Sequence, residues 1–271
     1  MKFSLSLLLL LSFTCWLYPL KAGFAAGQRP LSTESAVTLS PGTLEIELGV
    51  DFLRNQSFPF PTSAPRFNRD LWEIPVIGLH LGVDKRTEVQ FDYELLYLNE
   101  SSPGVGEKFG SGDLKVFTKI QILEDRDSHP ALGLRFGTKL PNADDVAHLG
   151  TNETDFLSSL LVTKFYQGVT FHANAGLGIL GNPFHAAQQD DVLLLGFASI
   201  LPVTPTLHFV MEIAGQTLSS KRNNVTSMRL GLQYQTGEVQ WDLGGSVRLT
   251  NQAADWEVLS GLTWRIRLWG R

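Results

Sequence analysis

The stretch TLEIELGVDF, residues 43–52, decides the fold class of this chain. Apolar side chains stand at every second position from Leu44 to Phe52, and polar or small residues stand between them. Side chains of a β-strand point alternately to its two faces. The stretch is therefore predicted to be a strand whose two faces meet different surroundings.

The same alternation recurs along most of the chain. Clear segments lie at residues 88–97, 113–122, 132–140, 169–179, 207–216, 228–235, 239–249 and 257–268, and less regular ones at 71–83, 156–165 and 192–201. Pro75 predicts a bulge or edge irregularity within the first irregular segment. A tilted membrane strand needs about 9–11 residues, whereas soluble strands usually have about 5–6. We therefore predict an all-β fold, a closed antiparallel transmembrane β-barrel of about 12 strands.

The connections between these segments support the membrane interpretation. Short turns are expected at 84–86, 124–130, 166–168, 202–205 and 236–238, and longer polar links at 54–70, 99–111, 141–155, 181–190, 217–224 and 250–255. Short periplasmic turns alternating with longer outer loops are typical of outer-membrane barrels. A secreted β-sandwich or lipocalin-like barrel would also alternate, but its strands would be shorter and its polar face richer in Lys and Glu.

The N-terminal region predicts export. Lys2 precedes an apolar run at 5–11, and small residues follow at 22–26, so residues 1–26 are expected to be a cleaved signal peptide. Residues 27–41 contain prolines among Ser and Thr and are expected to be an unstructured periplasmic lead-in. The barrel is then residues 42–271. Cys15, the only cysteine, lies in the signal segment, so the mature chain can form no disulfide.

Composition excludes two classes of protein. Beyond the N-terminus no stretch approaches the about 18 apolar residues of a spanning helix, which excludes a helical membrane protein. The chain has 22 basic and 27 acidic residues, a net charge of -5. Loss of Lys2 and Lys21 with the signal leaves 20 basic residues against 27 acidic ones, a net charge of about −7. This balance does not suit nucleic-acid binding, which needs a basic surface.

If the apolar faces contact lipid, the polar faces line the lumen. The candidate lumen-lining residues are Glu45, Glu47, Asp51, Glu88, Asp92, Glu94, Lys115, Lys119, Arg135, Lys139, His172, Arg229, Arg248, Arg265 and Arg267. Closure of the barrel is expected to bring Arg265 and Arg267 to the wall that carries Glu45 and Glu47. Two interpretations remain open: the charges pair and fill the lumen, or an acidic wall faces a basic wall across a solute-selecting pore.

Several motifs resemble the outer-membrane transporter family named for the meta pathway of phenol degradation. The matching stretches are GDL at 112–114 with Lys119, PALGLRFGTKLP at 130–141, LGT at 149–151 through Asp155-Phe156, and HANAG at 172–176. After Pro141 the family typically has Thr-Gly, whereas Asn142-Ala143 stand here. The resemblance implies a barrel with an uptake role and suggests phenolic solutes, and it supplies no catalytic or binding residues.

No catalytic, cofactor or metal site is predicted. Gly176, Gly178 and Gly181 have dinucleotide-binding spacing but lack the helix that such a site requires. The acidic residues at 144, 145, 153 and 155 match no calcium-site spacing. An enzyme barrel would need a Ser–His pair on the lipid face, but His172 and His208 are expected to point inward, as is His80. His172 is expected to pair with Asn174.

We therefore expect an outer-membrane channel or transporter for passive uptake of small polar or aromatic solutes, located in the outer membrane of a Gram-negative cell. Its expected partners are outer-membrane lipid and lipopolysaccharide, the barrel assembly machinery and a small-molecule solute. The alternative is an outer-membrane barrel without an open pore, acting as a lipid-modifying enzyme or as a structural or binding barrel.

Overall fold

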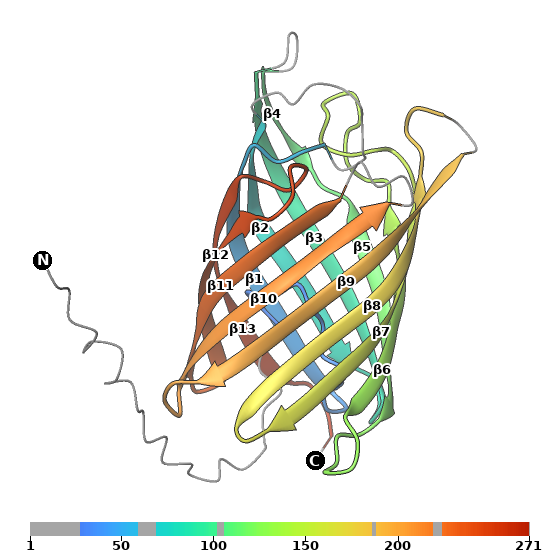
Figure 1. The fold of residues 1–271 in the computed structure, drawn as a ribbon. Coiled ribbons are helices and arrows are strands. Elements are labelled where there is room, and N and C mark those ends of the chain that lie inside the picture. Colours follow the sequence, from blue (N-terminus) through green and yellow to red (C-terminus); the bar gives the residue numbers. More distant parts are fainter. Residues whose placement is uncertain (1–27, 59–68, 102–105, 186–187, 219–223, 271) are drawn as a thin grey trace, which may run out of the picture.

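A computed structural model describes residues 28–58, 69–101, 106–185, 188–218 and 224–270. These residues form a single antiparallel sheet that closes on itself into a barrel (Figure 1). Its strands are β1 (Thr43–Arg54), β2 (Arg69–Gly82), β3 (Thr87–Glu100), β4 (Gly106–Ser111), β5 (Leu114–Leu123), β6 (Ala131–Leu140), β7 (Asp155–Tyr166), β8 (Val169–Gly181), β9 (Gln189–Pro202), β10 (Leu207–Leu218), β11 (Val225–Thr236), β12 (Val239–Arg248) and β13 (Trp256–Arg267).

β4 and β5 together occupy one position around the barrel. β5 pairs with the first half of β3, and β4 pairs with its last six residues. Between them the chain is interrupted at Gly112, whose amide still donates to the carbonyl of Glu94 at 2.8 Å. The barrel therefore has twelve strand positions, as the sequence predicted. The expectation that 99–111 is only a loop was wrong, because residues 106–111 extend the wall along β3.

The barrel closes between the first and the last strand. β1 pairs with β13 over its whole length and with β2 on its other side. Every described strand except the short β4, which pairs only with β3, is paired with a neighbour on both sides. A membrane-spanning sheet needs such pairing because lipid offers no hydrogen bonds. β2 is irregular where the sequence predicted it: its register with β3 shifts between Glu73 and Val76, around Pro75.

The alternating pattern places apolar side chains on the outside. Leu177 is 64% exposed, and its neighbours on adjacent strands, Leu193 and Ser158, show the same outward parity. Further exposed apolar residues on the wall include Leu48, Trp72, Leu79, Phe91, Phe156, Phe197, Ile213, Leu232, Trp241, Leu243, Val258 and Trp264. Such a band is the lipid-facing surface of an outer-membrane barrel. Among the described residues, no helix has the length and hydropathy to cross a membrane.

Short and long connections lie at opposite ends of the barrel, as predicted. The turns after β2, β7, β9 and β11 are short and share one end with the C-terminus, whereas the longer connections gather at the other end (Figure 1). At the short-turn end Gln167 and Gly168 have positive φ. In outer-membrane barrels the short turns lie on the periplasmic side and the longer loops on the outer side.

Candidate functional site

The described residues 28–41, which precede β1, lie inside the barrel. We call them the lumen segment. The sequence predicted that residues 27–41 would be a periplasmic lead-in without structure. The structure differs: the segment runs within the barrel (Figure 1), where it makes polar contacts with most of the strands. Its partners are Asp51 (β1), Glu88 (β3), Lys119 (β5), Arg135 (β6), Thr163 (β7), Glu212 (β10), Arg229 (β11), Asp242 (β12) and Ser260 (β13).

The first anchor of the lumen segment is the guanidinium of Arg29. It donates to Asp51 at 2.8 Å and lies 3.5 Å from Asp242. Gly49 and Gly261, opposite each other in β1 and β13, leave the space that the guanidinium occupies. A Cβ on Gly261 would lie 2.7 Å from Arg29 Nε, and one on Gly49 would overlap the guanidinium. Two glycines in register thus form the slot for this side chain.

The second anchor joins the segment to β10 and β11. The Glu212 carboxylate accepts from the backbone amide of Ser32 at 2.9 Å and also contacts Thr33. Arg229 donates to the carbonyl of Pro30 at 2.8 Å and lies 3.3 Å from Glu212. Glu212 therefore accepts from backbone amides of the segment, and Arg229 donates to one of its carbonyls. Buried backbone groups left without such partners would destabilise the fold.

The third anchor is Glu34, which faces the basic strands. Its carboxylate lies 3.6 Å from both Lys119 and Arg135. Burial opposes ionisation of Glu34, but Arg135 and then Lys119 outweigh it and hold the pKa of its carboxyl below the usual range. Lys119 also pairs with Glu88 at 2.9 Å, and Glu88 accepts from the amide of Leu39 at 2.8 Å. The segment is thus bound to the wall by alternating charges.

The segment also has an apolar side. Leu31 packs with Ala198, Ile200 and Val210, which point inward from β9 and β10. Ala36 packs with Ala131 and Leu161. These inward apolar residues explain why the segments at 156–165 and 192–201 carry apolar side chains on both faces: one face contacts lipid and the other contacts the lumen segment. The segment fits a lumen that is charged on one side and apolar on the other.

Most of the predicted lumen-lining residues lie on the inner face and are paired. Glu45 meets Arg265 across the closing seam at 2.7 Å, as expected. The other pairs are Asp92–Arg135 at 3.5 Å, Glu94–Lys115 at 3.2 Å, Lys139–Asp155 at 2.9 Å and Arg229–Glu257 at 2.8 Å. The charges of neighbouring strands thus neutralise one another or the lumen segment.

Three predictions about interior side chains differ from the structure: the contact of Arg267 with the acidic wall, the lumen-lining position of Arg248 and the pairing of His172 with Asn174. Glu47 lies opposite Thr263, while Arg267 is exposed at the end of β13 opposite Thr43. Arg248 is exposed and pairs with Asp255 in the loop before β13. His172 is buried, but its ring contacts Thr163 of β7 at 2.9 Å rather than Asn174. For His172 the sequence predicted a partner on the same strand, whereas the partner lies on the neighbouring strand.

Sequence reasoning missed several inward-facing charges. Glu212, Asp242 and Glu257 are buried and contact the lumen segment or its anchors. The strand alternation carried the signal for all three, because each follows the polar parity of its strand. The inward positions of Arg29 and Glu34 could not be predicted from strand alternation, because both residues precede the first strand.

A cavity of about 190 Å³ lies toward the long-loop end. Its charged lining is Arg69, Glu73, Glu94, Asp113, Lys115, Lys139 and Asp155, and its apolar lining is Leu71, Leu96, Leu149 and Leu180. Within the described residues, no ion pair joins Glu73 to a base. Arg69 donates to the carbonyl of His148 at 2.7 Å and lies 3.5 Å from Glu100. The cavity offers charges of both signs beside an apolar surface.

The described histidines do not support an enzyme on the lipid face. His80 and His172 are buried inside the barrel, and His208 follows the inward parity of Val210 and Glu212. His129, His148 and His185 lie in connections between strands.

A closed twelve-stranded barrel with an apolar outer band and a charged interior has the architecture of outer-membrane channels. Solved structures share this fold: the COG4313 outer membrane channel from Pseudomonas putida F1 aligns with a TM-score of 0.68 at 13% identity, over 85% of this chain and 98% of that one. The NanC porin aligns at 0.55 and 10% identity, over 82% and 100%. The translocator domain of the autotransporter NalP from Neisseria meningitidis aligns at 0.55 and 11%, over 83% and 88%.

Residues 27–266 match the family described as "Putative MetA-pathway of phenol degradation", and the chain belongs to this family. The match confirms the resemblance carried by the motifs at 112–176 and extends it over most of the chain. It also includes the lumen segment. Comparison with curated protein sequences found no match.

Proposed function

We propose that the protein is an outer-membrane channel for passive uptake of small polar or aromatic solutes, and that the lumen segment narrows its passage. The observation that carries the proposal is the cavity of about 190 Å³ with charges of both signs beside leucines. A cavity of about 150 Å³ can hold benzene, so the cavity suits a solute of single-ring size. Its carboxylates and bases suit polar substituents on such a solute.

The location supports this proposal. The apolar band meets lipid and the short turns meet the periplasm, so we infer insertion into the outer membrane of a Gram-negative cell. Export by a cleaved signal at residues 1–26, which lie outside the described residues, and assembly by the barrel assembly machinery belong to the same proposal. The long-loop end then faces lipopolysaccharide and the incoming solute.

The experiment is single-channel recording of the refolded barrel in a planar bilayer, with ion selectivity taken from reversal potentials. We expect discrete conductance steps. Glu94→Gln should shift the selectivity toward anions, because it removes a carboxylate from the cavity lining. Asp84→Asn, in an exposed turn, is the matched control and should leave the selectivity unchanged.

A second candidate is a barrel without an open pore that has a structural or binding role. The lumen segment favours it, since its contacts reach strands on all sides of the wall. A barrel that is folded, shown by resistance of its strands to protease, and yet stays silent in the bilayer would overturn the channel proposal and support this candidate.

A further inference from the structure

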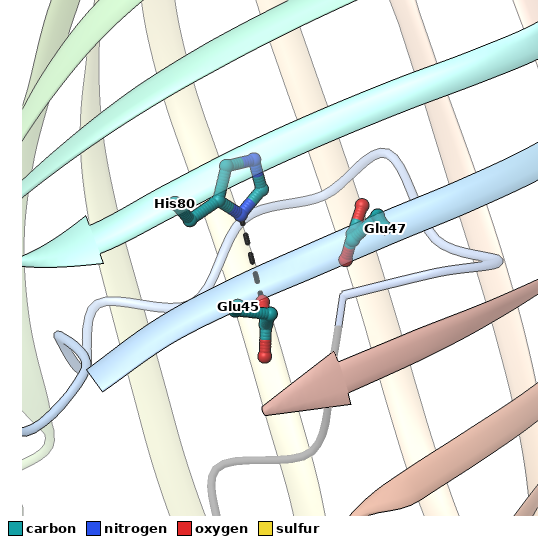
Figure 2. A group of neighbouring side chains, drawn as sticks. All are labelled: Glu45, Glu47 and His80. Carbon is teal, nitrogen blue, oxygen red and sulfur yellow. Dashed lines mark ion pairs between the residues drawn. The ribbon is translucent and has the colours of Figure 1, made fainter. Parts of the chain in front are cut away.

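Two carboxylates and one imidazole meet inside the barrel near its periplasmic end. Glu45 and Glu47 project from β1, and His80 projects from the paired strand β2 (Figure 2). One donor atom from each side chain lies within 4.8 Å of the other two, and all three residues are buried. This group is separate from the cavity at the long-loop end.

The His80 ring is oriented as a metal ligand would be. Its Nε2 lies 3.0 Å from Asp92 Oδ1, while its Nδ1 faces Glu45 Oε1 at 3.5 Å. Metal-binding histidines usually donate their second ring N–H to a carboxylate, which fixes the tautomer. With Nε2 held by Asp92, Nδ1 faces the Glu45 carboxylate, and a metal ion bound by both would take the place of a proton between them.

Glu47 provides an independent indication. Its side chain is buried, with 8% of the residue exposed, and its Oε1 has no hydrogen-bond partner. A buried carboxylate oxygen without a partner is costly. Gly78, opposite Glu47 in β2, lets the side chains of Glu47 and His80 lie close together: a Cβ there would lie 3.1 Å from Glu47 Cβ and 3.3 Å from both Glu47 Oε2 and His80 Nε2. The orphaned oxygen, beside a second carboxylate and an imidazole, points to a bound cation.

The charge balance indicates a divalent ion. The ion-pair network that runs through His80, together with Glu47, contains five carboxylates, those of Glu34, Glu45, Glu47, Glu88 and Asp92. Its permanent cations are Lys119, Arg135 and Arg265. Arg29, the next cation, is paired with Asp51 and Asp242. A histidine that binds a metal through Nδ1 is neutral, so in the metal-bound state two negative charges would remain, which one divalent cation would balance.

We propose that Glu45, Glu47 and His80 bind one divalent transition-metal ion of the zinc type. Imidazole with carboxylates suits such ions, whereas Mg²⁺ and Ca²⁺ prefer oxygen alone. Donors about 2.1 Å from a tetrahedral ion lie about 3.4 Å apart, so binding requires the side chains to close by about 1 Å. A cavity of about 20 Å³, lined by Glu45 and His80, has room for one water as a further ligand.

The test is titration of the refolded, tag-free barrel in detergent with Co²⁺ after treatment with a chelator, followed by calorimetry and by the visible absorption of the ion. We expect saturable binding of one ion per barrel, displaced by Zn²⁺. Glu47→Gln and His80→Gln should abolish this binding. Asp92→Asn, a positioning variant, should weaken it by about 10- to 100-fold. His208→Gln, which alters an inward histidine outside the group, should bind as the wild type does.

The proposal is overturned if the folded wild-type barrel binds no stoichiometric ion. It is also overturned if Glu47→Gln and His80→Gln, shown to be folded by protease resistance, bind Co²⁺ as tightly as His208→Gln does. Because binding is measured in detergent, its failure is distinct from failure of the channel proposal.

Discussion

Arg29 of the lumen segment lies 2.8 Å from Asp51 of β1, in a slot that exists because the wall carries glycine at positions 49 and 261. This contact ties the chain that precedes the barrel to the seam where the barrel closes. The N-terminal segment and the closing of the sheet are thus parts of one structure.

Gly49→Ala should loosen the lumen segment. The added methyl group would overlap the Arg29 guanidinium and force it away from Asp51. We expect a loss of about 1–3 kcal/mol in the free energy of unfolding, the range for overpacking of a filled interior. Urea unfolding in lipid vesicles measures it. Leu48→Ala, an outward-facing change on the same strand, is the control for altered lipid contact, and an undiminished stability of Gly49→Ala would show that the slot is unimportant.

A disulfide should lock the segment in place. Ser35 Oγ lies 3.5 Å from Thr163 Oγ1, and the mature chain is expected to contain no cysteine of its own. Ser35→Cys combined with Thr163→Cys is therefore expected to form a bond on oxidation, detected by mass spectrometry of a proteolytic digest. The pairing of Ser35→Cys with Ser158→Cys, on the outward face of β7, is the control. Equal cross-linking of both pairs would place the segment elsewhere.

Acid should release the segment. The pKa of Glu34 is lowered from 4.5, since Arg135 and Lys119 outweigh the effect of burial. Two further charged or titratable groups, His80 and Asp92, act on the Glu34 carboxylate: His80 lowers its pKa and Asp92 raises it. A lowered pKa in the docked state means that Glu34 stabilises docking above pH 4.5 and that this contribution is lost as the pH falls through the lowered pKa.

We therefore expect the conductance of the wild-type channel to rise as the pH falls below 4.5 and through the lowered pKa of Glu34. Glu34→Gln should already show the higher conductance at pH 7 and should respond less to acid. A pH response of the same size in both proteins would assign it to other groups.

The seam pair should be strongly coupled. Removing Arg265 leaves the buried carboxylate of Glu45 with less compensation. We expect Arg265→Gln to cost about 3 kcal/mol, the lower end for breaking a buried pair. Adding Glu45→Gln should recover most of this loss. Unfolding of both variants and of Glu45→Gln alone, in the presence of a chelator, completes the cycle, and additive effects would contradict direct coupling.

The sequence predicted the wall of the barrel because alternation from Leu44 to Phe52, repeated in later segments, reports directly on two faces with different surroundings. The predicted closure of the barrel places the last strand beside the first, and the predicted approach of Arg265 to Glu45 is present in the structure. The strand at 106–111 escaped detection because it is short and interrupted at Gly112, so its alternation is too brief to distinguish from a polar loop.

The interior was harder to predict. The lumen segment has no periodicity of its own, and its position depends on Arg29 and Glu34 finding partners on distant strands. The group of Glu45, Glu47 and His80 depends on the register of β1 with β2, which shifts between Gly49 and Asp51. The spacing of residues along the chain reveals neither the partners of the lumen segment nor the register of β1 with β2.

The lumen segment is proposed to restrict the channel that surrounds it. A comparison of single-channel conductance between the wild-type barrel and a variant lacking residues 28–38, in the same bilayers, tests this proposal. We predict discrete steps from both proteins, with larger steps from the variant. Silence of both folded barrels would contradict the channel, and equal conductance would contradict the restriction by the lumen segment.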